Sequence, residues 1–279
     1  MTGIPPRILA IAGSDSSGGA GIQADIKTIT MLGGYAMTAI TAVTAQNTQG
    51  VQAIAPLSGE MVSQQIASCI EDIGVDAVKI GMLHDSEVIR AVSTALAPVP
   101  RTVDGPRTFP QGAIVLDPVM LATSGAPLIT EDAIAAMKAQ LFPLATLITP
   151  NLPELAHLAG RTLRTPEEVA EAAFELAEQF KCHVLAKGGH ADGDRVVDLL
   201  IGPGDARAAS FDDPRIDTRH THGTGCTLSS AIATLLGHGQ SLEHAVRLGR
   251  QFVRRAIGQA PGFGLGNGPL GHQAVRGSA

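Results

Sequence analysis

Short apolar runs that end in a glycine or a polar residue recur along the chain and alternate with segments of helical periodicity. The runs end at Gly13, Gln46, Gly81, Asp117, Asn151 and Lys187. Such runs are typical of strands buried on both faces of a parallel sheet. Their alternation with helices predicts an α/β protein with an open, mostly parallel sheet. Ligands bind outside the carboxyl ends of the strands in such a sheet, so these turns should line one groove.

The same pattern gives the expected elements. Strands are expected at residues 7–13, 35–45, 51–57, 76–83, 113–118, 144–149 and 182–190, and a hairpin at 195–201 and 208–211. Helices are expected at residues 22–32, 60–73, 85–97, 130–141, 155–159, 166–180, 224–236 and 242–257. No linker divides the chain, so we assign 1–279 to a single domain. Within it, the proline-rich segment 98–112 is a predicted surface loop and 262–279 a glycine-rich C-terminal tail.

Composition restricts the classes of partner. A formal net charge of −6 over 279 residues argues against a nucleic-acid surface. We expect no membrane partner, because no apolar segment has the length of a span and no signal peptide is evident. Three widely scattered cysteines favour a reduced, cytoplasmic setting. His190, His220 and His222 lack the spacing of a zinc site, so loop hydrogen bonds are their expected role.

The strongest local signal is a glycine motif near the C-terminal end. Gly223 and Gly225 bracket Thr224 directly before 227–236, a run of small and apolar residues that predicts a buried helix. The first N–H groups of a helix lack partners inside it, and glycine lets the backbone approach a ligand closely. With the positive end of the helix dipole, these groups favour a phosphate or a transferring phosphoryl group. The motif therefore predicts an anion site, with Cys226 at its edge.

A second glycine-rich segment, residues 14–21, separates the first predicted strand from the first predicted helix. It is no Walker loop, because no Lys-Ser or Lys-Thr pair follows the glycines, and its spacing does not match the dinucleotide fingerprint. Taken alone, the segment is equally consistent with a tight strand-to-helix turn and with a ligand-binding loop.

Several polar residues beside predicted strands have two interpretations each. Asp117 and Glu154 could bind magnesium beside a phosphate, or Glu154 could only cap a helix together with Asn151. Lys187 could pair with a phosphate or simply extend its charge from a buried stem. Cys226 could be a small buried helix residue. Alternatively, the helix N-terminus could depress its pKa and make it a proton acceptor.

The chain resembles a known family. Motifs of that family are found in order over nearly the whole chain, at residues 12–25, 45–48, 79–83, 117–120, 149–154, 187–190 and 221–227. They resemble the hydroxymethylpyrimidine/phosphomethylpyrimidine kinases of thiamine biosynthesis, within the ribokinase-like superfamily. The resemblance implies a three-layer α/β/α fold, the cofactors ATP and Mg²⁺, and a homodimer. It also implies two successive phosphorylations of 4-amino-5-hydroxymethyl-2-methylpyrimidine, first on the hydroxyl and then on the monophosphate.

The resemblance also implies the pyrimidine site. Gln46 would read the ring, and its amide suits this role because it presents a donor beside an acceptor. The rest of the substrate pocket would be formed by Gly13, Asp15, Ala20 and Met82.

The nucleotide side follows by the same resemblance. Asp117 and Glu154 would hold Mg²⁺ and its waters, with Asn151 beside them in the nucleotide site. Lys187 and Thr221 would contact the phosphates. The catalytic anion hole would consist of Gly223, Thr224, Gly225 and Cys226. Sugar kinases of the superfamily have an aspartate base at the last of these positions, where this subfamily has cysteine. A loose phosphoryl-transfer transition state tolerates that change, because positioning and charge neutralisation dominate.

Three residues depart from the pattern of the family. Thr123 takes the place of a frequent lysine, Thr44 that of a pocket valine, and Asn267 that of a frequent histidine. None of these changes removes a central role.

Two other functions compete with the pyrimidine kinase. Pyridoxal kinase activity arises on similar scaffolds, and pyridoxal also has a hydroxymethyl group on a six-membered heteroaromatic ring. A catalytically silent protein that only binds the pyrimidine is the second alternative. The presence of Asp117, Glu154, Lys187 and the glycine motif argues against it.

Overall fold

The structure is a computed structural model that describes residues 3–97, 112–120, 128–190 and 193–275. The strands are β1 (Arg7–Asp15), β2 (Tyr35–Asn47), β3 (Gly50–Pro56), β4 (Ala77–Ile80), β5 (Ala113–Leu116), β6 (Leu147–Ile148), β7 (His183–Ala186), β8 (Arg195–Gly202) and β9 (Asp205–Pro214). The α-helices are α1 (Gly21–Met31), α2 (Gly59–Ser68), α3 (Ser86–Leu96), α4 (Glu131–Gln140), α5 (Leu152–Ala159), α6 (Pro166–Phe180), α7 (Thr224–Gly237) and α8 (Leu242–Gly258).

All these strands belong to one nine-stranded sheet, in the order β3-β2-β1-β4-β5-β6-β7-β8-β9. The strands from β2 to β7 in this order run parallel, and β3, β8 and β9 pair antiparallel at the two edges. The mostly parallel sheet and the hairpin are therefore confirmed. The hairpin strand β9 is longer at both ends than the expected 208–211.

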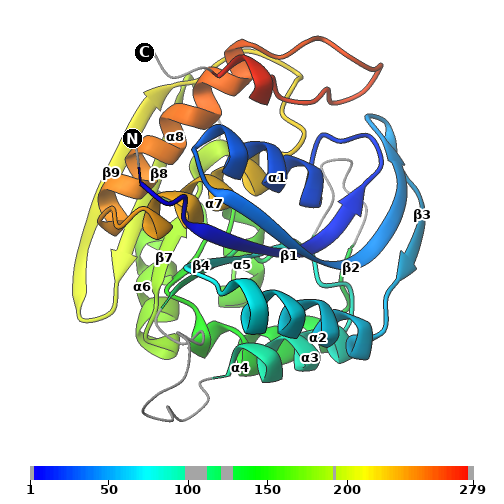
Figure 1. The fold of residues 1–279 in the computed structure, drawn as a ribbon. Helices are drawn as coiled ribbons and strands as arrows, with labels where there is room; N and C mark the ends of the chain where they lie inside the picture. The colour runs from blue at the N-terminus through cyan, green and yellow to red at the C-terminus, as the bar shows by residue number, and fades with distance from the viewer. Residues whose placement is uncertain (1–2, 98–111, 121–127, 191–192, 276–279) are drawn as a thin grey trace.

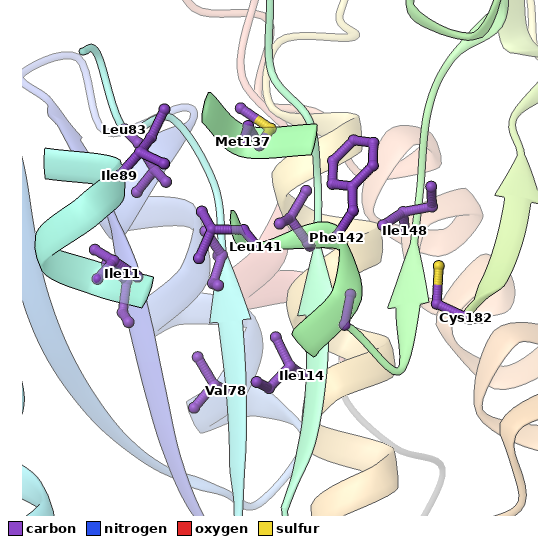
Figure 2. Close-up of a cluster of buried hydrophobic side chains, with 14 of the residues drawn as sticks. Ile11, Val78, Leu83, Ile89, Ile114, Met137, Leu141, Phe142, Ile148 and Cys182 are labelled. Carbon is purple, nitrogen blue, oxygen red and sulfur yellow. The ribbon is translucent and has the colours of Figure 1, made fainter. Parts of the chain in front are cut away.

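Helices cover both faces of the sheet, which gives three layers (Figure 1). Alternate residues of β1 show why: Leu9 and Ile11 belong to a buried cluster that includes residues of α2 to α6, whereas Ile8 and Ala10 belong to a second cluster that includes residues of α1, α7 and α8. Figure 2 shows the first of these clusters, in which side chains from several parallel strands meet the helix α4 and the turn that follows it. The predicted α/β/α architecture is thus confirmed.

The boundaries of two helices differ from expectation. The predicted helix 60–73 is an α-helix only to Ser68 and continues as a π-helical turn, Cys69–Ile73. The predicted helix 155–159 begins earlier, at Leu152, because Asn151 and Glu154 form a capping box at its start. The capping contacts expected of these two residues are therefore confirmed.

Parts of two predicted segments lie outside the described residues. Residues 98–111 of the predicted surface loop 98–112 are not among the described residues. Thr123 is not among them either. In the glycine-rich tail, described to residue 275, Leu270 and Val275 pack against Phe252 and Ala256 of α8.

Candidate active site

A cavity of about 880 Å³ lies at the carboxyl ends of the parallel strands. Every residue predicted for the site lines it: Gly13, Asp15, Ala20, Gln46, Met82, Asp117, Asn151, Glu154, Lys187, Thr221, Gly223, Thr224, Gly225 and Cys226. These residues are scattered along the sequence, and the topology of the sheet brings them together. The groove expected from the ends of the strands is therefore a single cavity.

The first glycine loop is organised by the carboxylate of Asp15, which is buried. It accepts hydrogen bonds from the backbone N–H groups of Ser17 (2.8 Å), Gly19 (3.1 Å) and Ala20 (2.8 Å). Its Oδ2 atom also lies 2.8 Å from Nε2 of His222. Burial opposes ionisation, but the hydrogen bonds from His222 and Ser17 keep the pKa of Asp15 below its usual value. Asp15 therefore lies at the cavity as an ionised group that shapes the loop.

The two glycine motifs lie against each other. A Cβ atom at Gly223 would collide with the carbonyl oxygen of Gly19, and Gly223 has a φ of 87°. His222, beside Gly223, joins the loops through Asp15 and donates its backbone N–H to the carbonyl of Gly268 (3.2 Å). The predicted hydrogen-bonding role is thus confirmed for His222. Residues of the segment 14–21 line the cavity, which favours its interpretation as a ligand-binding loop.

The helix α7 begins at the cavity. Its N-cap residue, Gly223, has no side chain to satisfy the first-turn N–H groups of the helix. A Cβ atom at Gly225 would lie 3.0 Å from Oδ2 of Asp117 and 3.4 Å from Nζ of Lys187. Glycine at this position therefore lets the first turn of α7 lie directly beside a carboxylate and an ammonium group.

The electrostatics of Cys226 distinguish between its two interpretations. Desolvation raises the pKa of its thiol to about 11. The Lys79 ammonium and the backbone N–H of Gly21 oppose this rise, whereas Asp25 and Asp117 add to it. Of the two interpretations of Cys226, the small helix residue is therefore supported over the proton acceptor with a depressed pKa, because desolvation outweighs the effects that lower the pKa. The thiol is protonated at neutral pH.

A lysine and an aspartate from neighbouring strand ends pair in the cavity. Nζ of Lys187, after β7, lies 2.8 Å from Oδ1 of Asp117, after β5. The same Oδ1 atom accepts a hydrogen bond from the hydroxyl of Thr149 (3.0 Å), after β6. The side chain of Lys187 is 14 % exposed, so its charge reaches the cavity. The pair can therefore contact both a cation and an anion.

Glu154 adds a second carboxyl group to this pair. Its Oε2 atom accepts the backbone N–H of Asn151 (2.8 Å), and Oε1 accepts that of Met120 (3.4 Å). Burial raises the pKa of Glu154 to about 7; Lys187 opposes the rise and Asp117 adds to it. A buried carboxyl group at this pKa is easily ionised by an added positive charge. The donor set therefore suits a hard divalent cation.

The amide of Gln46 is restrained by its neighbour on β2. The hydroxyl of Thr44 lies 2.7 Å from the carbonyl oxygen of Ser14 and 3.2 Å from Oε1 of Gln46. Thr44 also lines the cavity. Of the three departures noted in the sequence, Thr44 is therefore one that contacts Gln46 directly.

Two buried charged clusters beside the site were missed by sequence reasoning. Lys79 of β4 and Asp25 of α1 form an ion pair, both with fully buried side chains. The sequence contained a sign of this pair, since Lys79 interrupts an apolar strand and Asp25 an apolar helix face. In the lining of the cavity, Arg250 pairs with Asp198, whose Oδ1 atom accepts the backbone N–H of Gly188 (2.7 Å). This second cluster holds the turn that follows Lys187.

Together, the layered fold and the phosphate-suited helix N-terminus beside a carboxylate–lysine pair define a protein of the ribokinase-like kinase class. The chain belongs to the phosphomethylpyrimidine kinase family, whose model matches residues 15–271. The resemblance found in the sequence is thereby confirmed. Within the described residues, no helix has the length and apolar character that crossing a membrane requires.

The chain matches different shares of the length of its named relatives. The chain is 41 % identical over 270 residues to the hydroxymethylpyrimidine/phosphomethylpyrimidine kinase of Bacillus subtilis, covering 97 % of this chain and 96 % of that protein. It is 43 % identical over 265 residues to the thiamine biosynthesis bifunctional protein of Geobacter sulfurreducens. That match covers 95 % of this chain but 52 % of the relative, so the chain spans about half of that protein.

Solved structures of two kinds of kinase share the fold. The phosphomethylpyrimidine kinase of Clostridium difficile is 38 % identical, with a TM-score of 0.76 over 90 % of this chain and 99 % of that one. The pyridoxal kinase of Bacillus subtilis, solved as an ADP complex, is 32 % identical, with a TM-score of 0.84 over 98 % of this chain and 99 % of that one.

Proposed function

We propose that the protein is an ATP-dependent kinase of thiamine biosynthesis. Its substrate is 4-amino-5-hydroxymethyl-2-methylpyrimidine, which it phosphorylates first on the hydroxyl and then on the resulting monophosphate. The observation that carries this proposal is the single cavity, in which the amide of Gln46, the Asp117–Lys187 pair and the N-terminus of α7 all face the same space. Family membership supports the same activity.

The nucleotide would bind through its phosphates. Lys187 and Thr221 contact them, with Asn151 beside, and the first turn of α7 stabilises the negative charge of the transferring phosphoryl group. The residues suited to Mg²⁺ are Asp117 and Glu154, because they are two carboxyl groups at one wall of the cavity. When bound there, Mg²⁺ supplies neutralisation of the phosphate charge.

The proton of the substrate hydroxyl needs no strong base at Cys226. The thiol is protonated at neutral pH, so it serves to shape the anion hole rather than to remove the proton at the start. In a loose transition state, the proton of the hydroxyl can leave late. In the second step a phosphate oxygen is the nucleophile, which scarcely needs a base.

The decisive test is product formation. Purified protein with ATP, Mg²⁺ and the pyrimidine should give first the monophosphate and then the diphosphate, followed by mass spectrometry over time. Chelation of Mg²⁺ should abolish both products. Binding of the pyrimidine without ATP turnover would instead support the silent binding protein.

Pyridoxal phosphorylation is a second candidate, favoured by the high structural similarity to the pyridoxal kinase. The two activities separate in a competition assay with equal concentrations of pyridoxal and the pyrimidine. We expect the pyrimidine products to predominate. A monophosphate formed from pyridoxal alone would overturn the proposed substrate.

We also propose a homodimer in the cytoplasm. Three free cysteines are compatible with a reducing compartment, and the family resemblance implies the dimer. Sedimentation equilibrium should give twice the mass of the 279-residue chain. A monomer mass at every concentration tested would contradict the assembly but leave the kinase activity unaffected.

A further inference from the structure

The helices α1 and α7 both begin at the cavity and contact each other through two matched pairs of residues. The backbone of Gly21, the first residue of α1, lies close enough to the thiol of Cys226 in the first turn of α7 to lower the pKa of that thiol. One turn further along both helices, the hydroxyl of Ser230 donates to Oδ1 of Asp25 (2.7 Å). Because residues four apart share a helix face, the two contacts lie along one line between the helices.

A residue of the central strand β4 also binds Asp25 of this second contact. Nζ of Lys79 lies 2.8 Å from both carboxylate oxygens of Asp25, and both side chains are fully buried. A Cβ atom at Gly81, directly after β4, would lie 2.7 Å from the same Nζ atom and 3.1 Å from Cβ of Ala12, so a side chain at this position would press on the ion pair. The cluster Lys79–Asp25–Ser230 therefore ties β4, α1 and α7 together directly behind the anion site.

Stability alone does not account for this cluster. Taking two charges out of water is costly, and well-packed apolar residues of similar volume are often as stable as a buried ion pair. A single interaction with defined geometry can, however, fix the relative position of the elements that it joins. Here the joined elements are the two helix termini that face the cavity.

We propose that the Lys79–Asp25–Ser230 cluster is a positioning device. It fixes the first turn of α7 against that of α1 and so sets the position of the N–H groups that form the anion hole. None of the three residues contacts the cavity, so they act through Gly225 and Cys226. The inference rests on the proposed kinase function for its effect on rate, but its effect on geometry is independent of the reaction.

The variant Ser230→Ala tests the link with little change to the core, because the Lys79–Asp25 pair stays intact. We expect kcat to fall about tenfold, since small misplacements of catalytic groups are costly, while KM for the pyrimidine changes less than about twofold. The matched control is Thr234→Ala on the same helix, whose hydroxyl bonds only to the Ser230 carbonyl (2.7 Å). The control should keep the wild-type kcat.

A second measurement needs no kinase activity. In a Cys69→Ala background, the rate of alkylation of Cys226 by iodoacetamide, assigned by peptide mass spectrometry, reports how firmly the thiol is held. Ser230→Ala should raise this rate at least about threefold, and Thr234→Ala should not, because only the first loses the link to α1. A wild-type alkylation rate in folded Ser230→Ala, with unchanged kcat, would overturn the inference.

The double variant Lys79→Met/Asp25→Leu removes the cluster while keeping its volume, and it should give the same loss of kcat and the same faster alkylation in a folded protein. If the double variant retains the wild-type values, the cluster has no positioning role. An inactive wild-type protein would refute the proposed function, whereas the alkylation result would still decide the inference.

Discussion

At the scale of single residues, Cys226 shows that a chemical role depends on solvation as much as on position. The sequence places a cysteine at a helix N-terminus, where thiols are often acidic. In the structure, desolvation raises its pKa to about 11. The residue is therefore better suited to shape the anion hole than to accept a proton.

This interpretation predicts the behaviour of Cys226→Ser. A positional role should slow both phosphorylations by a similar factor, because both use the same anion hole. The measurement is single-turnover kinetics, with the hydroxymethyl pyrimidine and its monophosphate as separate substrates. If the first step is slowed far more than the second, Cys226 acts as a base.

Thr44 makes a second prediction at this scale. Thr44→Val keeps the shape of the side chain but removes the contacts with Ser14 and Gln46. Loss of one or two neutral hydrogen bonds, about 1 kcal/mol each, should weaken pyrimidine binding about fivefold and leave ATP binding unchanged.

Calorimetric titration with each ligand measures both effects. Gln46→Ala should give a larger loss for the pyrimidine than Thr44→Val does, again without loss for ATP. Thr38→Val on the same strand does not line the cavity and is the matched control. Equal weakening of both ligands by Gln46→Ala would refute its role as the pyrimidine reader.

At the scale of elements, the buried pair Lys79–Asp25 couples β4 to α1. Burial disfavours the charged form of Lys79, but the Asp25 carboxylate holds the pKa of Lys79 above its usual value. The ammonium is therefore charged in the folded state, and removing either partner leaves an isolated charge in the core.

Lys79→Met should accordingly lower the free energy of unfolding by about 3–5 kcal/mol, because it leaves the Asp25 carboxylate unpaired. Lys79→Met/Asp25→Leu should recover most of this loss, since it removes both charges. Urea unfolding at neutral pH measures both values. A single variant as stable as the wild type would show that Asp25 is already uncharged in the folded protein.

At the scale of the whole molecule, the C-terminal segment completes the core behind the site. His272 is buried, and its Nε2 atom lies 2.8 Å from Oγ1 of Thr227 in α7. Burial, with a smaller effect of Lys27, lowers the pKa of His272 to about 4. The unfolded chain binds a proton near pH 6.5, so the folded state loses stability as the pH falls through that value towards 4.

We therefore expect His272→Gln to flatten part of the pH dependence of stability. On going from pH 7.5 to pH 5, the free energy of unfolding of the wild type should fall by about 2 kcal/mol more than that of the variant. Urea unfolding of both proteins at the two pH values isolates the difference, because their other titrating groups are the same. An identical decrease in both would mean that His272 is accessible to protons in the folded state.

The sequence by itself determined the architecture and the membership of the cavity. Apolar runs that end in polar turns indicate a mostly parallel sheet, and the topology of that sheet brings Gln46, Asp117, Lys187 and Cys226 to one cavity. Caps such as that of Asn151 and Glu154 were also readable, because a capping box is local in sequence.

Only the tertiary structure decided the charge states and the long-range pairs. The protonated thiol of Cys226, the raised pKa of Glu154 and the Lys79–Asp25 ion pair all depend on how completely neighbouring elements exclude water. Desolvation and Coulomb interactions act between atoms that are close in space, whatever their separation in the chain. The glycine motif near the C-terminus therefore identified an anion site, and the packing of α1 and β4 behind it decided how that site is held.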